Sequence, residues 1–399
     1  MPIRITPVES ARDVRQFIEL PHRIYAGDPY WVAPLHNEIR KLLSRKKNPF
    51  FLHSDAALWL AWHDGELVGR ISAQINRLHL ERYRDATGNF GFLEAFDDQA
   101  VFDALLATAE NWLRARGMRR AVGPYSLTIN DDIGVLISGF DMPPSALMGH
   151  SPPYYGARLE AAGYRKAKDL YAYRLDIGEI KPEVRERMRR IAERFNPDGR
   201  ITLRRLDLKR FEQEMRLVLD IYNDAWQDNW GFLPVTDEEA RVLVAAIKPI
   251  IRPEQIVIAE MDGRTVGVIA SIPNINEIIA DLNGRLLPFG WAKFLWRMRM
   301  SPPKSVRVTL AGTLYELRDS PLSGGITTLL LEALVDTYFA TGITGIECSW
   351  ILEDNKGSIG ITRLFGKIAK TYRVYERDLA PAEAALQDAS SLRHSSAAI

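Results

Sequence analysis

The sequence is poor in the features that mark secreted, membrane-spanning and metal-binding proteins. Its 399 residues include one cysteine, Cys348, which excludes a disulfide framework and is typical of a reducing compartment. There is no apolar run of about eighteen residues, and residues 1–11 lack the apolar segment of a signal peptide. The histidines are not spaced as metal ligands, so we expect no metal. These absences predict a cytoplasmic protein.

The chain also lacks an excess of charge of one sign. There are 52 Lys and Arg residues against 51 Asp and Glu residues, so the formal net charge is +1. A balance this close gives no long-range attraction to nucleic acid. We therefore expect no nucleic-acid partner, and any electrostatic targeting must come from a local cluster of charges.

The most informative feature that is present is an internal repeat. Residues 61–76, AWHDGELVGRISAQIN, align without a gap with residues 259–274, AEMDGRTVGVIASIPN. Each segment places Asp-Gly between apolar runs, which is a strong β-hairpin signal. Further matches follow in the same order: Arg4-Ile5-Thr6 with Arg200-Ile201-Thr202, Ile24-Tyr25 with Ile221-Tyr222, Trp31 with Trp230, Gly117 with Gly342, Asn130 with Asn355, and Tyr173 with Tyr375.

The order of elements in each copy is strand, helices, hairpin, strand, helix, strand, helix and strand. This order predicts an α/β (α+β) fold of two tandem domains, each with a mixed, mostly antiparallel sheet flanked by helices. We expect the following segments: an N-terminal domain at 1–178, a charged and solvated helical linker at 179–199, a C-terminal domain at 200–380 with an amphipathic insertion at 281–305, and a disordered tail at 381–399.

This order, with the pattern DGxxVGxI in each first hairpin, resembles the GNAT acyltransferase superfamily. The resemblance implies an acyl-CoA held between two central strands, with its pyrophosphate at the start of the following helix. A helix N-terminus suits an anion because its first N–H groups are unpaired and its dipole is favourable. The resemblance also implies that a backbone N–H near the end of the strand, at 313–317, binds the thioester oxygen.

Only the C-terminal copy has residues that suit a phosphate at this helix start. Its strand is followed by RDSPLSGG, whose arginine, hydroxyl groups and paired glycines fit a phosphate cradle, although an ordinary loop with a helix cap also fits. The expected carrier-binding residues are Tyr315, Leu317, Arg318, Ser320, Leu322, Ser323, Gly324, Gly325 and Asn355. The N-terminal copy has Glu94, Asp97 and Asp98 there, and we expect it to shape the acceptor site instead of binding CoA.

The C-terminal copy carries an insertion that the N-terminal copy lacks. Residues 283–308 contain six basic residues and no acidic residue, among many apolar side chains. At helical spacing Trp291, Phe294, Leu295 and Met298 share a face. Aromatic and apolar residues flanked by Lys and Arg are typical of an element in the lipid headgroup layer, and a lid or domain-contact helix is the alternative. A second basic and aromatic stretch, 41–53, would extend this surface.

Several longer segments resemble the bacterial ceramide synthase family, a branch of the GNAT class. They are HRIYAGDPYWVAPL, NPFFLHSDAALWLA, GRISAQINRLH, NFGFLEAFDD, INDDIGVLISGFDMPP and NDAWQDNWGFLPVTDEE. The resemblance implies transfer of a fatty acyl group to the amine of a sphingoid base, from acyl-CoA or acyl carrier protein. It also implies a lipid amine and an anionic membrane surface as partners, and a location peripheral to the inner membrane.

The candidate catalytic groups are those that could move protons during amide formation. The family resemblance makes Tyr372 and Tyr375 candidates for protonating the leaving thiolate, although aromatic residues in a strand are also typical of a core. Candidates for the base that deprotonates the amine are Glu347, Glu353, Asp131, Asp132 and His150. The acceptor is expected to meet Asn229, Trp230, Trp291, Phe294 and Trp296.

Three other functions remain open on the sequence alone. The chain could be a GNAT enzyme that acylates a small amine, or an aminoacyl-tRNA-dependent transferase, although its charge balance does not favour tRNA. It could also be a catalytically inactive lipid-binding protein. Loss of acyl-CoA binding in Gly324→Asp or Arg318→Glu would distinguish an enzyme from the inactive protein.

Overall fold

The computed structural model of the protein describes residues 2–380, so the predicted disordered tail at 381–399 lies outside the described residues. The N-terminal copy consists of β1 (Arg4–Pro7), α1 (Ala11–Glu19), α2 (Pro21–Ile24), α3 (His36–Leu42), α4 (Phe50–His53), β2 (Ser54–His63), β3 (Glu66–Asn76), α5 (Arg77–Tyr83), β4 (Thr87–Ala95), α6 (Gln99–Arg114), β5 (Arg120–Gly123), β6 (Val135–Ser138), α7 (Tyr155–Ala161) and β7 (Arg165–Asp176).

The second copy follows a connecting helix, α8 (Pro182–Phe195). It consists of β8 (Ile201–Arg205), α9 (Phe211–Ala225), α10 (Asp237–Ile247), β9 (Ile256–Met261), β10 (Arg264–Pro273), α11 (Asn276–Ile279), α12 (Gly290–Met300), β11 (Ser305–Thr313), α13 (Pro321–Thr341), β12 (Gly345–Leu352), α14 (Lys356–Thr362) and β13 (Lys367–Asp378). None of the described helices combines the length and apolar character that a membrane span needs.

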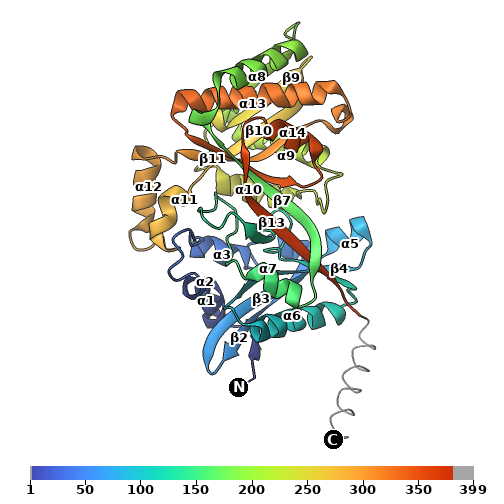
Figure 1. Ribbon diagram of the computed structural model, residues 1–399, viewed down its shortest axis with the longest axis vertical. Helices are drawn as coiled ribbons and strands as arrows, with labels where there is room; N and C mark the ends of the chain where they lie inside the picture. Colours follow the sequence, from blue (N-terminus) through green and yellow to red (C-terminus); the bar gives the residue numbers. More distant parts are fainter. Residues whose placement is uncertain (1, 381–399) are drawn as a thin grey trace, which may run out of the picture.

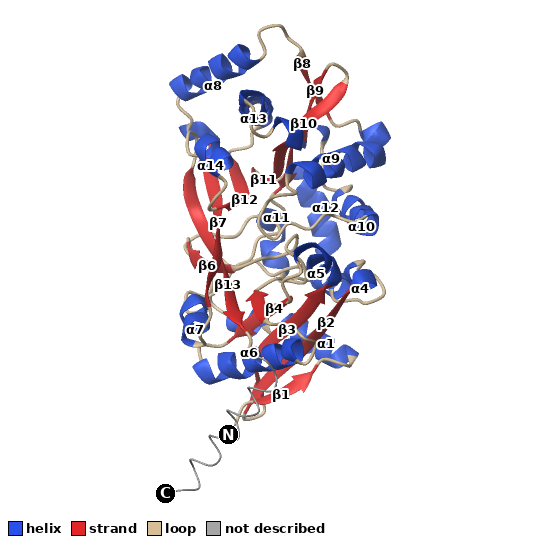
Figure 2. Cartoon of the chain, turned by 90° about the vertical axis from the view of Figure 1, so that its right-hand side faces the viewer, coloured by secondary structure: helices blue, strands red, loops and turns tan. Residues whose placement is uncertain are grey.

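Within residues 2–380 the strands form one continuous sheet that runs through both copies (Figures 1 and 2). The strand order is β1-β2-β3-β4-β5-β13-β7-β12-β11-β10-β9-β8, and β6 pairs with β13 outside this path. Among the described strands, only the pairs β4–β5 and β11–β12 are parallel. The predicted mixed, mostly antiparallel sheets flanked by helices are therefore confirmed.

The copies exchange their last strands at the centre of this sheet. β7, from the N-terminal copy, lies between β12 and β13, and β13 lies between β5 and β7. Tyr173 of β7 is thereby opposite Cys348 of the C-terminal copy, whereas Tyr375 of β13 is opposite Gly123 of the N-terminal copy. Residues near the end of each copy therefore serve the sheet of the other copy.

Both hairpins have the turn that the Asp-Gly pairs predict. Asp64 and Gly65 have φ of 50° and 83°, and Asp262 and Gly263 have φ of 52° and 78°. Two successive residues in the left-handed region are what a two-residue type I′ turn requires, and Asp and Gly tolerate it better than most residues. The repeat seen in the sequence is thus a repeat of backbone conformation.

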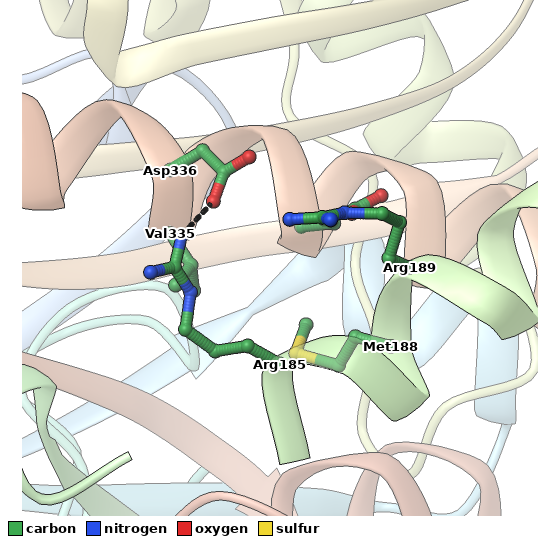
Figure 3. Close-up of a pocket in the computed structure, with 6 residues that line it drawn as sticks. Arg185, Met188, Arg189, Val335 and Asp336 are labelled. Carbon is green, nitrogen blue, oxygen red and sulfur yellow. Dashed lines mark hydrogen bonds and ion pairs between the residues drawn. The ribbon is translucent and has the colours of Figure 1, made fainter. Parts of the chain in front are cut away.

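The connecting helix α8 is not the fully solvated connector that its charge predicts. Met188 and Ala192 are buried on its inner face, which packs against α13. Arg185 and Asp336 form an ion pair of 2.7 Å between the two helices (Figure 3). The amphipathic pattern of α8 explains this burial, because its few apolar residues fall on one face.

Candidate active site

The central opening of the C-terminal copy begins where β11 and β12 separate. The two strands pair in parallel only from Ser305↔Gly345 to Val308↔Cys348. At the same point β10 changes register against β11, pairing Ala270 with Leu310 but Ser271 with Val308, so Thr309 is an extra residue on β11. A bulge of this kind bends a strand away from its neighbour. The strands therefore diverge after Val308.

Backbone groups on β11 face this opening. Leu314 N–H donates to Val266 O of β10 at 3.0 Å. Because successive residues of a strand point their backbone groups to opposite sides, those of Thr313 and Ala311 point away from β10. Trp226 Nε1 donates to Ala311 O at 3.4 Å from that side. Of the expected donors at 313–317, Thr313 ends β11, whereas Tyr315–Leu317 form a short 3₁₀ turn.

The equivalent opening of the N-terminal copy is filled by two tyrosines. Ala95 occupies the position of Thr313, since each is paired with the second glycine of its hairpin motif, Gly69 or Gly267. Tyr155 Oη accepts a hydrogen bond from Ala95 N at 3.0 Å, and Tyr154 Oη donates one to Ala95 O at 2.8 Å.

A carboxylate reinforces this closure. Tyr155 Oη and Tyr25 Oη both donate to Glu94 Oε2, at 2.6 and 3.0 Å. Burial raises the pKa of Glu94 to about 6 despite the nearby Arg70. A side chain of Asp98 caps the following helix by accepting from Ala100 N. These contacts leave the N-terminal helix start poorly suited to a phosphate.

The helix start of the C-terminal copy is more open. No side chain caps α13, because the hydroxyl of Ser320 donates to Leu317 O at 2.7 Å instead. Gly324 is exposed, and a Cβ atom there would meet no atom within 4 Å. Ser323 Oγ lies 2.7 Å from Thr313 Oγ1. Gly325 differs, since a Cβ atom there would come within 2.4 Å of the Phe195 ring.

Three of the expected carrier-binding residues have partners within the protein. Arg318 forms an ion pair of 3.0 Å with Asp228, and Tyr315 Oη donates to the same carboxylate at 2.6 Å. Asn355 caps α14 by accepting from Ser358 N at 3.0 Å. To bind a phosphate, Arg318 would therefore have to give up its ion pair with Asp228.

A buried polar chain lies at the point where β11 and β12 separate. Arg307 Nε donates to Ser349 Oγ at 2.9 Å, and Ser349 Oγ donates to Glu347 Oε1 at 2.8 Å. Glu347 Oε2 accepts from Ser145 Oγ at 2.8 Å. Arg307 was expected in the membrane-facing insertion, but it is buried here because β11 begins at Ser305.

This series of hydrogen-bonded side chains holds the loop at 144–150, which belongs to the N-terminal copy, against the opening. Arg307 donates to Ala146 O at 3.1 Å and to Leu147 O at 3.0 Å. Tyr372 Oη donates to Gly149 O at 3.0 Å, and the Tyr372 ring meets the edge of the Trp350 ring at 6.3 Å. Trp350 lies two residues after Cys348, the last residue of β12 that pairs with β11. The loop therefore lies beside the start of the opening.

The predicted proton-transfer residues differ in how they are placed. Tyr372 is buried beside the opening, whereas Tyr375 lies in the core of the N-terminal copy, where its hydroxyl donates to Glu160 at 3.1 Å. Asp131 Oδ2 accepts from Thr128 N and Oγ1 at 3.0 and 2.9 Å, which is a turn-stabilising contact. Burial raises the pKa of Asp131 to about 7.

Two further candidates, Glu353 and His150, are held by partners or enclosed. Glu353 accepts from Lys166 Nζ at 2.5 Å and from Asp169 N at 3.1 Å. His150 Nε2 lies 2.9 Å from Asp28 Oδ2, and the His150 side chain is only 2% exposed. Its Nδ1 is buried without a partner in the described part of the chain. Burial lowers the pKa of His150, so the ring is neutral at neutral pH.

The expected acceptor residues fall into two groups. Asn229 and Trp230 are in the loop after α9, and Trp230 helps to line a cavity of about 140 Å³ between the copies, together with His79, Asp85 and Arg120. Trp291, Phe294 and Trp296 are in α12, which has no buried residue. The structure does not join the two groups into one pocket.

The insertion presents apolar side chains to solvent. Leu287, Phe289, Trp291, Leu295, Trp296 and Met300 are each 50–78% exposed. Phe294 and Met298 are only partly exposed, so the exposed face differs from the predicted one. Lys293 and Arg297 are turned toward Asp281, with which both form ion pairs. Arg285 also forms an ion pair of 3.7 Å with Glu19. The positive charge predicted for this surface is therefore partly neutralised by acidic residues outside 283–308.

Several important residues carry no local signal in the sequence. The local sequence indicates a turn after two prolines at Tyr154 and Tyr155. It indicates an ordinary strand residue at Ser349 and a loop residue at Gly149. Each matters because a distant segment packs against it. A comparison of the two copies at Ala95 and Thr313 is the one signal that could have indicated the filled opening.

Comparisons with known proteins fit this geometry. No protein-family model matches the chain. It is 44% identical over 380 residues to the bacterial ceramide synthase of Caulobacter vibrioides (strain NA1000 / CB15N), covering 94% of this chain and 98% of the relative. The chain belongs to the bacterial ceramide synthase family. A second relative, Protein YghO of Escherichia coli (strain K12), is 41% identical over 370 residues, covering 92% and 93%.

Solved structures confirm the fold of this ceramide synthase family member. A tandem GNAT protein from the clavulanic acid biosynthesis pathway superimposes with a TM-score of 0.55 at 13% identity, covering 95% of this chain and 99% of that one. A GCN5-related N-acetyltransferase from Sphaerobacter thermophilus gives 0.53 at 13% identity, covering 95% and 96%. The family and the tandem GNAT fold together make the chain an N-acyltransferase.

Proposed function

We propose that the protein joins a long-chain fatty acyl group to the amine of a sphingoid base, giving a ceramide or its 3-keto form. The acyl group arrives as a thioester of CoA or of acyl carrier protein. The main support is the contrast between the two openings: Thr313 N–H points away from β10 and donates to no side chain in the described residues, whereas the equivalent Ala95 N–H is bonded to Tyr155. A thioester carbonyl needs such a free donor as charge develops on its oxygen.

The carrier is proposed to enter along the C-terminal opening, with its phosphates at the start of α13. The uncapped N–H groups and the open space at Gly324 favour an anion at this place. The N-terminal copy is proposed to contribute the acceptor side, through the loop at 144–150 that lies against the opening. Tyr372 is the better placed of the two tyrosines to protonate the leaving thiolate.

We further propose that the insertion brings the enzyme to an anionic membrane surface, where long-chain substrates reside. Exposure of its six apolar side chains to water is unfavourable, and their transfer into the headgroup layer would lower the free energy. Arg285, Arg299 and Lys304 are exposed on the same segment and would be attracted by anionic lipids. The proposed location is therefore the cytoplasm, peripheral to the inner membrane.

The function is tested by incubating pure protein with a long-chain acyl-CoA and a sphingoid base and measuring the amide by mass spectrometry. A parallel reaction with acyl carrier protein identifies the donor. Spermine and an amino acid replace the sphingoid base in two further reactions. Amide from the lipid amine alone supports the proposal. Amide from the small amines alone, or binding of acyl-CoA without turnover, would contradict it.

A further inference from the structure

Asp132 follows the turn at 130–131 of the N-terminal copy, and its carboxyl group lies beside Gly149 of the loop at 144–150. Asp132 is exposed, yet enough protein surrounds its carboxyl group that desolvation raises its pKa to about 6. The opposing influences come from Arg307, from Arg70 and from the backbone N–H groups of Ile133 and Gly149. An accessible carboxylate with these surroundings differs from every other base candidate in the described structure.

The alternatives are less available to a substrate amine. Glu347 has both oxygens bonded to serine hydroxyls, and Asp131 is held by Thr128. His150 is enclosed, at 2% exposure of its side chain. For Asp132, no described side chain forms a hydrogen bond or an ion pair with the carboxyl group, which accepts from the backbone N–H groups of Ile133 and Gly149. A Cβ atom built on Gly149 would lie 2.5 Å from Asp132 Oδ1.

Gly149 also connects Asp132 to the opening. Its N–H faces the Asp132 carboxyl group, and its carbonyl oxygen accepts from Tyr372 Oη at 3.0 Å. The Tyr372 ring in turn meets Trp350 at the start of the opening. Arg307, which faces Asp132, is bonded to Ser349 at the same place. An acid candidate and a carboxylate therefore lie on the two sides of one glycine.

We infer that Asp132 binds the acceptor ammonium and acts as the general base of the transfer, and that Gly149 holds the carboxyl group in place. This inference rests on the proposed N-acyltransferase function. The ammonium gives one proton to Asp132, and the freed lone pair attacks the thioester carbonyl. The C–S bond then breaks, and a second N–H proton ends on the sulfur, so the carrier leaves as a thiol. Asp132 returns its proton to solvent.

The two guanidinium groups fit this role. Arg307 and Arg70 keep part of the Asp132 population ionised near neutral pH, although burial favours the protonated acid. A base is most efficient when its pKa lies near the working pH, because it is then both deprotonated and basic enough. Tyr372, Glu94 and Asp131 are the other titratable groups that interact with this carboxyl group.

The test uses two long-chain acceptors, a primary amine that is an ammonium ion at neutral pH and an alkoxyamine that is neutral. Asp132→Asn keeps the shape and can still accept the Gly149 N–H. We expect it to lower kcat with the amine by about 10²-fold or more and to change kcat with the alkoxyamine much less. The rise of kcat/KM with pH near pH 6 should disappear. Transfer to the alkoxyamine shows that the variant is folded.

A second variant and two controls keep the inference falsifiable. Gly149→Ala should push the Asp132 carboxyl group aside and lower kcat with the amine while transfer to the alkoxyamine persists. Asp141→Asn removes an exposed carboxylate from the adjoining loop and should have no effect. Equal loss with both acceptors in Asp132→Asn, or a larger loss in Asp131→Asn, would overturn the inference. Wild-type protein that acylates neither acceptor would instead refute the proposed function itself.

Discussion

Thr313 and Ala95 end equivalent strands of the two copies, but only Ala95 has both backbone groups bonded to tyrosine hydroxyls. The same strand end is therefore closed in one copy and open in the other. Strand pairing does not cause the difference, because Phe96 N–H and Leu314 N–H donate equivalently to Val68 and Val266. The difference comes from α7, which supplies the two tyrosines.

A first prediction concerns the start of α13. Gly324→Asp should weaken acyl-CoA binding by about tenfold or more, because a carboxylate would occupy the place of a phosphate. The fold should tolerate it, since nothing lies within 4 Å of the new Cβ atom. Calorimetric titration measures the affinity. Gly324→Ala is the matched control with no charge and should bind normally. Unchanged affinity in the aspartate variant would place the carrier elsewhere.

Gly325 offers a contrasting prediction one residue away. Gly325→Ala should lower the unfolding free energy by about 1–3 kcal/mol, because the added methyl would overlap the Phe195 ring. Denaturant unfolding of this variant beside Gly324→Ala measures the difference. Equal stability of the two variants would show that α8 does not pack against α13 as described.

The insertion gives a prediction about membranes. Replacing both Trp291 and Trp296 by serine should reduce binding to anionic phospholipid vesicles by about tenfold or more, since two large apolar side chains no longer leave water. Vesicle sedimentation measures this binding. Thermal stability should not fall, because α12 buries no residue. Leu208→Ser, at another exposed apolar residue, is the control. Equal binding by all three proteins would argue that the insertion is a lid.

Replacement of each tyrosine of β13 by phenylalanine distinguishes the roles of their hydroxyl groups. Tyr372→Phe should lower kcat by about tenfold or more, because its ring adjoins the opening. Tyr375→Phe should lower it less, because that hydroxyl is bonded to Glu160 inside the N-terminal copy. Steady-state kinetics with both substrates gives the comparison. A larger loss in Tyr375→Phe would favour Tyr375 as the group that protonates the leaving thiolate.

Asp131 gives a prediction about pH and stability. Its pKa is about 7 in the folded protein and is raised from an ordinary value of 3.8, so the folded state binds the extra proton between these values. The unfolding free energy contributed by this group is therefore highest at low pH and falls as pH rises toward 7. Asp131→Asn should lessen this fall by roughly 1 kcal/mol or more. Urea unfolding across this pH range measures it; parallel curves would contradict the prediction.

The sequence predicted much of this fold because its signals are local. Asp64-Gly65 and Asp262-Gly263 specify tight turns whatever surrounds them, and the repeat places both hairpins at the same point of each copy. The absence of a carrier site in the N-terminal copy stays a prediction, although Asp98 does cap α6 as its position suggests.

The rest depends on contacts between distant segments. Nothing near Tyr375 shows that β13 crosses to β5, because strand register is chosen by packing across the whole sheet. Arg307 reads as one more cation of a basic insertion, and only the position of β11 shows that it is buried against Ser349. Asp132 and Gly149 are likewise brought together only by the folded loop.

Because the two halves exchange strands, neither half forms its complete sheet without the other. A half made alone would expose the sheet edge that its neighbour normally covers, and a chain cut near residue 199 would still be held together by the ladders of β7 and β13. The first half can therefore lose a carrier opening of its own without becoming dispensable. The first half still completes the sheet of the second half, and its loops can therefore specialise for the second substrate.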